Sequence, residues 1–235
     1  IGQRSSEETH LIFMALAGSG GDEVLAPLET KLFEGGWFAR SPDAYRRALA
    51  INPGHAEAHN NLGNILRRRG EFAAAIECWR QAIASRPGHP EALANLGAAL
   101  TKSDRLEEAI DALQASLRSR PAHGDTLAQL SETLRLAGRP RESLAVAQRG
   151  EQTEAHNPRL QIQKSRALSA LQRTDEALAV IRLAAGVTAG NADVHAELAQ
   201  QLEYAGERAE AARVWHEVLT FKPDDADALA GVIGL

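Results

Sequence analysis

The feature that most constrains this chain is a pattern of similar residues that returns every 34 positions. Leucine occupies the same place in five consecutive periods, at Leu66, Leu100, Leu134, Leu168 and Leu202. Small residues form a second row at Ala75, Ala109, Ser143, Ala177 and Ala211. Because coincident rows of this kind seldom arise by chance, the chain is predicted to consist of repeated supersecondary units.

Each unit has the pattern of two short helices. In residues 56–89, Leu62, Ile65 and Leu66 follow the i, i+3, i+4 spacing of an amphipathic helix, and a glycine then interrupts the pattern. A second run with the same spacing ends at Pro87, which cannot continue a helix. Helices this short are marginal alone in water, so neighbouring units are expected to stack and supply the core.

The composition favours helices and limits the choice of partner. Apolar residues make up 44% of the chain but aromatic residues only 4%, which suits close helix packing better than a β-sheet. The formal net charge of −5 argues against nucleic acid as a partner. Cys78 is the only cysteine, so no disulfide can form within one chain. No apolar run is long enough to predict a membrane span.

The unit at 56–89 resembles a tetratricopeptide repeat. It carries Leu62-Gly63 and Leu66, then Ala75 and Trp79, then Pro87, at the spacing of that family's pattern. The resemblance implies an all-α, right-handed α-solenoid of stacked antiparallel helix pairs. The units also resemble those in the superhelix of O-linked N-acetylglucosamine transferases and related bacterial repeat proteins.

The repeat boundaries follow from the same spacing. Within an array at 41–235, five full repeats are predicted at 56–89, 90–123, 124–157, 158–191 and 192–225, with partial repeats at both ends. Residues 1–40 are expected to form helices that cap the array or belong to a divergent first repeat. The middle of the array is expected to be its softest part, because Lys164 occupies a position that is leucine in the other four repeats.

At the other end, residues 226–235 have the pattern of a first helix without its partner. We expect the natural protein to continue beyond Leu235. The uncovered apolar face of this helix is also expected to offer a surface for self-association.

The resemblance implies that the first helices line an inner groove that binds peptides. One row along them is unusual, because four of its five members are side-chain amides: Asn61, Asn95, Gln129, Gln163 and Glu197. An amide can donate and accept hydrogen bonds, so a ladder of amides could hold an extended backbone. The alternative is that these amides are polar surface or bond to the adjacent helix. Each neutral hydrogen bond contributes only about 0.5–1.5 kcal/mol, so side-chain pockets must add to any affinity.

Other candidate groove residues lie on the same helices. Arg67, Arg68 and Lys102 would favour an acidic partner segment, although they also fit a charged surface with no ligand role. Asn60 and Asn64 match part of the clamp by which some tetratricopeptide domains hold a chaperone's carboxyl terminus. Alanines at 94 and 98 depart from that clamp, so we do not expect it here.

The chain carries no recognisable catalytic, metal or cofactor motif. The run at 18–21 lacks the Gly-Lys-Ser/Thr ending of a phosphate loop, and His216-Glu217 lacks the second histidine of a metalloprotease helix. His55, His89 and His123 recur at the repeat interval and are expected to lie in turns, too far apart to share a metal.

The leading interpretation is a non-enzymatic scaffold that binds a protein or an extended peptide in its groove. The alternatives are the substrate-recruiting arm of a larger glycosyltransferase or sulfotransferase, and a self-assembling structural scaffold. A cytoplasmic location is expected, with the periplasm left open.

Overall fold

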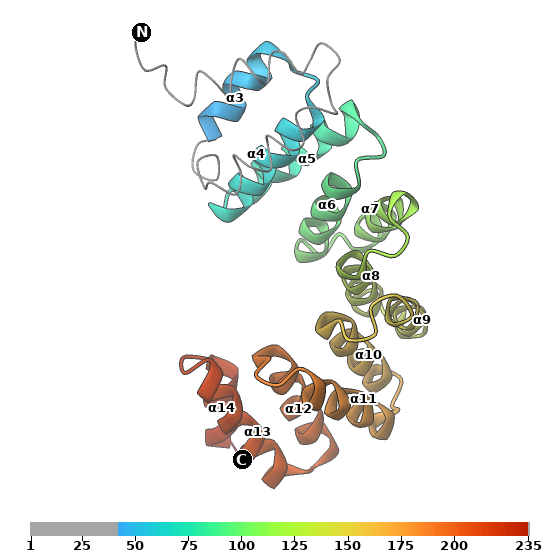
Figure 1. Cartoon of the computed structure of the whole chain (residues 1–235), viewed down its shortest axis with the longest axis vertical. Coiled ribbons are helices and arrows are strands. Elements are labelled where there is room, and N and C mark those ends of the chain that lie inside the picture. Colours follow the sequence, from blue (N-terminus) through green and yellow to red (C-terminus); the bar gives the residue numbers. More distant parts are fainter. Residues whose placement is uncertain (1–41, 235) are drawn as a thin grey trace. The chain divides into compact units, whose positions relative to one another are not determined.

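The computed structural model describes residues 42–234, so the helices expected within 1–40 lie outside the described residues. Every regular element in 42–234 is an α-helix. The helices are α3 (Pro42–Ile51), α4 (Ala56–Arg68), α5 (Phe72–Ser85), α6 (Pro90–Lys102), α7 (Leu106–Ser119), α8 (Gly124–Leu136), α9 (Pro140–Glu151), α10 (Pro158–Ala170), α11 (Thr174–Val187), α12 (Ala192–Ala205), α13 (Arg208–Phe221) and α14 (Ala226–Gly234). The all-α helical repeat predicted from the periodicity is therefore confirmed (Figure 1).

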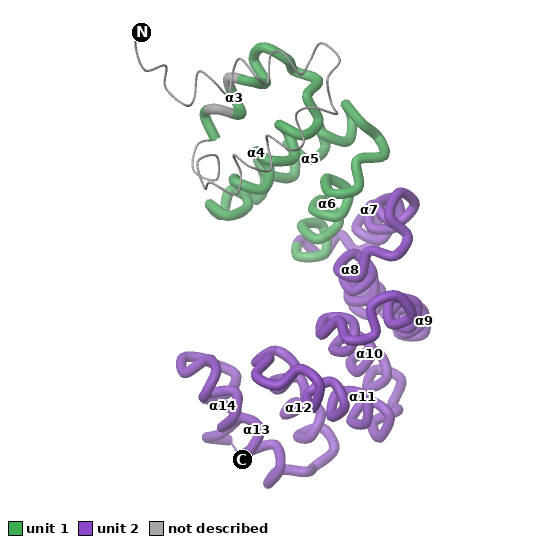
Figure 2. The backbone as a smooth tube through the Cα atoms, in the orientation of Figure 1, with its two compact units in different colours: residues 1–102 green, residues 103–235 purple. Residues whose placement is uncertain are grey.

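The chain divides into two compact units. Unit 1 ends at Lys102 and unit 2 begins at Ser103, so α6 closes the first unit and α7 opens the second (Figure 2). In unit 1, α4 packs on α3, α5 and α6. In unit 2, α8, α10 and α12 are successive neighbours, and each also packs on the second helix of its own repeat.

The turns within repeats share one backbone conformation. In the turn that follows each first helix, one residue has a positive φ: Gly70 (80°), Asp104 (57°), Gly138 (73°), Gln172 (60°) and Gly206 (82°). This turn row recurs at the repeat interval. Because the left-handed conformation costs other residues free energy that glycine avoids, the sequence marks three of the five turns with glycine.

The recurring histidines are helix caps. His55 and His123 lie in turns, as expected, and each Nδ1 accepts a hydrogen bond from a backbone N–H of the following helix. In the later repeats Asn157, Asn191 and Asp225 occupy the equivalent position and accept the same kind of bond through a side-chain oxygen. The histidine row therefore belongs to a longer row of N-caps, which satisfy N–H groups that a helix start would otherwise leave unpaired.

Small residues allow the two helices of a repeat to approach closely. Ser131 on α8 and Ser143 on α9 are buried against each other, and their hydroxyls donate to each other's backbone carbonyls at 2.9 and 2.7 Å. Ser165 on α10 donates to the carbonyl of Ala177 on α11 at 3.2 Å. In unit 1, a Cβ added to Gly63 would lie 2.6 Å from Nε1 of the buried Trp79, so no larger residue fits there without a shift.

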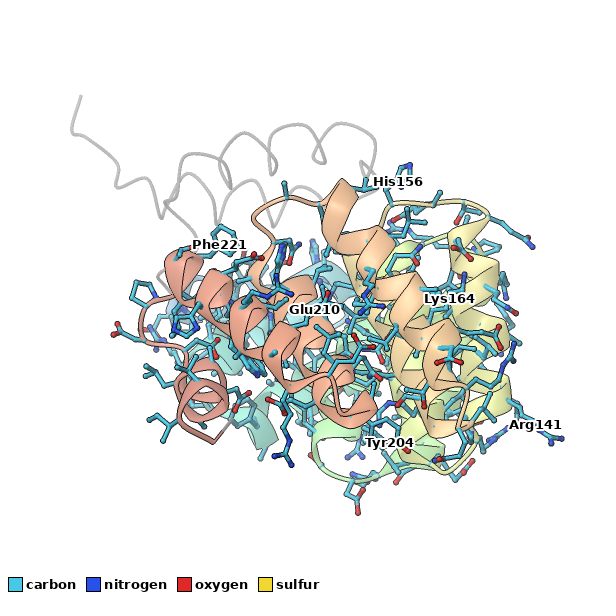
Figure 3. All side chains as sticks on the ribbon, turned by 90° about the horizontal axis from the view of Figure 1, so that it is seen from below. Arg141, His156, Lys164, Tyr204, Glu210 and Phe221 are labelled. Carbon is cyan, nitrogen blue, oxygen red and sulfur yellow. The ribbon has the colours of Figure 1, made fainter. Side chains whose placement is uncertain are left out.

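The unusual lysine of the fourth repeat has a specific partner. Lys164, labelled in Figure 3, donates to both carboxylate oxygens of Glu151 at 2.9 and 2.7 Å. Glu151 supplies a hydrogen-bonded counter-charge for the partly buried ammonium group that stands where the other repeats have leucine. The expected softness of this region stays a prediction.

Candidate peptide-binding groove

A groove runs along the first helices of unit 2. It has a volume of about 330 Å³ and is lined by residues from α8, α10, α12 and the start of α14. Side chains at equivalent positions of consecutive repeats line it because the first helices are neighbours in the stack. Three predicted groove residues, Gln129, Gln163 and Glu197, all contribute to its lining. We call this surface the unit 2 groove.

Two amides in the unit 2 groove have carbonyl oxygens that are buried and have no hydrogen-bond partner among the described residues. These atoms are Oε1 of Gln129 and Oε1 of Gln163. Gln163 is only 7% exposed, while Gln129 is half-buried. A buried polar atom without a partner costs free energy, so a rotation of either side chain that brings its oxygen to a donor on a ligand would be a net gain.

The third member of the row, Glu197, is already held in place. This residue is 1% exposed, and its Oε2 accepts a bond from Nε of Arg166 at 2.6 Å. Its Oε1 accepts a bond from Nε2 of Gln201 at 2.8 Å. The buried carboxylate is therefore neutralised and fixed by residues of α10 and α12, and it helps orient Arg166 in the groove wall.

Beside the unit 2 groove, a depression of about 380 Å³ extends toward the carboxyl ends of α8, α10 and α12. Its lining includes Arg135, Gln201 and Tyr204, the last of which is labelled in Figure 3. Burial, with the neighbouring Arg166, lowers the pKa of Arg135. Nε of Arg135 and Oε1 of Gln201 are buried without partners among the described residues. This end can therefore both donate and accept hydrogen bonds.

The predicted residues of unit 1 are arranged differently. Nδ2 of Asn95 donates to Oδ1 of Asn60 at 3.1 Å, and Nδ2 of Asn60 donates to Oδ1 of Asn61 at 3.4 Å. These amides therefore bond to one another between α4 and α6, as the alternative interpretation of the ladder allowed. Oδ1 of Asn64 is buried without a partner among the described residues.

The predicted basic residues lie at helix ends of unit 1. Arg67 and Arg68 are exposed in the last turn of α4, and Lys102 is exposed at the end of α6. Cations at these positions interact favourably with the carbonyl end of a helix, which accounts for them without a ligand. Their role in binding an acidic segment stays a prediction.

Sequence reasoning missed several residues that line the unit 2 groove. Glu132, Arg166 and Gln200 line it from three consecutive repeats. They occupy the row that begins at Asn64, so the repeat interval that revealed the amide row could also have revealed them. The row was not evident because its members differ in charge from repeat to repeat.

A further cavity of about 510 Å³ lies between α12, α13 and α14. Two of its lining residues are already bonded to each other, because Nε1 of Trp215 donates to Oε1 of Glu203 at 2.6 Å. It therefore offers less unsatisfied hydrogen-bonding capacity than the unit 2 groove does.

Residues 42–234 contain neither a cluster of metal ligands nor a helix that could span a membrane. No group of three or more His, Cys, Asp or Glu side chains there is placed to hold a metal ion. Within the same range, the helices are all too short or too polar to cross a bilayer.

Stacked helix pairs with a shared turn and cap define a helical repeat solenoid with a polar groove along its first helices. Two family models, both described as tetratricopeptide repeat, match residues 62–123 and 44–77. Residues 44–123 therefore match the tetratricopeptide repeat family, and the later helix pairs continue the same repeat interval. No curated protein matched its sequence.

Several solved structures share this fold. YrrB, a tetratricopeptide repeat protein with an unusual peptide-binding site, is 22% identical with a TM-score of 0.59, covering 81% of this chain and 98% of its own. PilF of Pseudomonas aeruginosa is 18% identical with a TM-score of 0.69, and the match covers 97% of this chain and 99% of PilF. A tetratricopeptide repeat protein from Parabacteroides merdae is 16% identical with a TM-score of 0.74, and the match covers 89% of this chain and 83% of that protein. At these identities the likeness shows the fold.

Proposed function

We propose that this chain is a protein-interaction scaffold that holds an extended segment of a partner in the unit 2 groove. Tetratricopeptide repeat proteins are generally scaffolds without catalytic activity. The description of YrrB as having a peptide-binding site supports a similar use of this fold.

The observation that carries the proposal is the pair of unpartnered carbonyl oxygens on Gln129 and Gln163. They lie on neighbouring helices and both line the same groove. An extended peptide presents N–H groups at regular intervals along its length, so it can supply donors to both. The fixed Glu197 carboxylate and Arg166 form the adjoining wall and limit the positions that a peptide can take.

Display selection tests this proposal without a known partner. Peptides enriched from a randomised library on the whole chain are measured against the double variant Gln129→Ala/Gln163→Ala. Because two hydrogen bonds are lost, we expect affinity to fall on the order of tenfold, with helicity by circular dichroism near that of the parent.

The matched control is Gln148→Ala, since Gln148 is an exposed amide on α9 and lines none of the cavities described above. It should leave affinity unchanged. Enriched peptides that bind the double variant as well as the parent would remove the unit 2 groove from the proposed function.

A further inference from the structure

The charges around the unit 2 groove are strongly unequal. Acidic residues outnumber basic ones by five to two in its lining. The acids are Glu132, Asp193, Glu197, Asp225 and Asp227, and the bases are Arg159 and Arg166. A surface with this balance attracts cations and repels anions, and low-dielectric walls strengthen the effect.

Both arginines already have acidic partners. Arg166 is bound by the buried Glu197, and Arg159 lies 3.3 Å from Asp125. Neither is therefore available at full strength for an acidic ligand. Of the other acids, Asp193 pairs with Lys222 at 2.6 Å through an exposed contact, and Asp225 caps the first turn of α14.

Two acids of the lining have no such partner. Glu132 on α8 and Asp227 on α14 form no hydrogen bond or ion pair with the described residues of the chain. The charge of Glu132 does act to raise the pKa of the nearby Arg135. Glu132 is half-buried and Asp227 is exposed. Glu132 gains more from a cation on the ligand than Asp227 does, because water screens a half-buried carboxylate less than an exposed one.

The buried amide oxygens of the groove, like its carboxylates, favour a ligand that donates hydrogen bonds. Oε1 of Gln129 and Oε1 of Gln163 are buried acceptors that lack donors. Acceptors and carboxylates together call for a ligand that is rich in N–H groups. The opposite tendency appears at Arg135, which lines the neighbouring depression toward the carboxyl ends of the helices.

From these observations we propose that the unit 2 groove selects a basic, extended segment of another protein. Its backbone N–H groups donate to Gln129 and Gln163, and its Lys or Arg side chains lie against Glu132 and Asp227. This inference rests on the proposed function and adds the chemical class of the partner. It differs from the acidic partner expected from Arg67, Arg68 and Lys102, which belong to unit 1.

The test compares three labelled twelve-residue peptides, in which alanine alternates with lysine, glutamine or glutamate. Binding to the whole chain is followed by fluorescence anisotropy at several salt concentrations. We expect the lysine peptide to bind at least about tenfold more tightly than the glutamate peptide, and its affinity to fall as salt rises.

The variants separate local from overall charge. Glu132→Gln/Asp227→Asn should weaken lysine-peptide binding on the order of tenfold and reduce its dependence on salt. The matched control, Asp111→Asn/Asp175→Asn, makes the same change of net charge at exposed positions on α7 and α11. It should leave binding within about twofold of the parent.

The outcomes distinguish this inference from the proposed function. If the glutamine or glutamate peptide binds as tightly as the lysine peptide and depends on Gln129 and Gln163, groove binding holds and the basic preference is overturned. Equal weakening by both charge variants would also overturn it, because only net charge would then matter. If peptides enriched by display selection are insensitive to Gln129→Ala/Gln163→Ala, the proposed function itself fails.

Discussion

At the scale of single residues, the turn row shows where this sequence departs from the best local choice. Gly70, Gly138 and Gly206 adopt a left-handed backbone without a Cβ, whereas Gln172 adopts the same conformation at φ 60°. A side chain in this region is strained because its Cβ approaches the backbone carbonyl. Glutamine has no short polar group to offset that cost locally, as asparagine or aspartate has.

Gln172→Gly should therefore stabilise the chain. We expect the free energy of unfolding to rise by about 0.5–1 kcal/mol, since the relief of strain exceeds the added entropy of the unfolded glycine. Chemical denaturation measures the change. Gln152→Gly is the control, because Gln152 has a φ of −65° and gains nothing from glycine. A Gln172 variant less stable than the parent would show that the lost hydrogen bond from Tyr204 outweighs the strain.

A second residue-scale feature joins the start and the end of the repeat at 56–89. His89 is 0% exposed, and its Nε2 lies 3.2 Å from Oε2 of Glu57, which also pairs with Arg86. The contact with His89 and its charge, together with the pairing to Arg86, hold the pKa of Glu57 at about 2, although burial acts to raise it. The ionised carboxylate is thus strongly preferred in the folded chain.

This lowered pKa predicts a pH dependence with a definite sign. A carboxyl group whose pKa is lower in the folded state stabilises it above the unfolded pKa, and the contribution is lost as pH falls toward the folded pKa. Glu57→Gln should cost about 1 kcal/mol at pH 6, after discounting for partial exposure, and the difference from the parent should shrink between pH 4.5 and about 2. Nuclear magnetic resonance titration of the Glu57 carboxyl carbon measures the pKa directly. A midpoint near 4.5 would contradict the assignment.

At the scale of helices, the repeat period predicts most of what is observed. Apolar spacing, glycine and proline are local signals, so both helices of each repeat and the turn between them could be predicted. The cap row was visible as recurring histidines, but its continuation at Asn157, Asn191 and Asp225 was hidden by the change of residue type. Side-chain chemistry unites that row, because each member accepts bonds from a helix start.

The caps give a prediction at this scale. Oδ1 of Asn191 accepts bonds from the backbone N–H groups of Asp193 and Val194 at the start of α12. Asn191→Ala should lower the free energy of unfolding by about 1 kcal/mol, whereas Asn191→Ser should largely retain it because serine also caps well. Thermal and chemical denaturation of both variants test this. Equal loss in both would indicate that packing, not capping, makes Asn191 necessary.

At the scale of the whole molecule, the repeat pattern predicts the fold better than it predicts the site. The row of amides lies on the first helices, as expected, yet Asn61 and Asn95 both bond to Asn60, while the buried oxygens of Gln129 and Gln163 have no partner among the described residues. The sequence treats these residues as equivalent. Their difference depends on side-chain length and on which neighbour each amide can reach, and a one-dimensional pattern does not contain that information.

The last prediction concerns the apolar face of α14. Ala228 is buried and Gly231 lies against Trp215, but Leu229 is 45% exposed and Ile233 is 85% exposed. Clustered apolar side chains in water favour association, so we expect the chain to self-associate as its concentration rises. Static light scattering measures this, and Leu229→Glu/Ile233→Glu should restore the monomer. Leu183→Glu is the control, because Leu183 is 72% exposed on α11 and should not contribute to this interface. A parent chain that remains monomeric at every concentration would instead leave the face of α14 free of any role in contacts between copies.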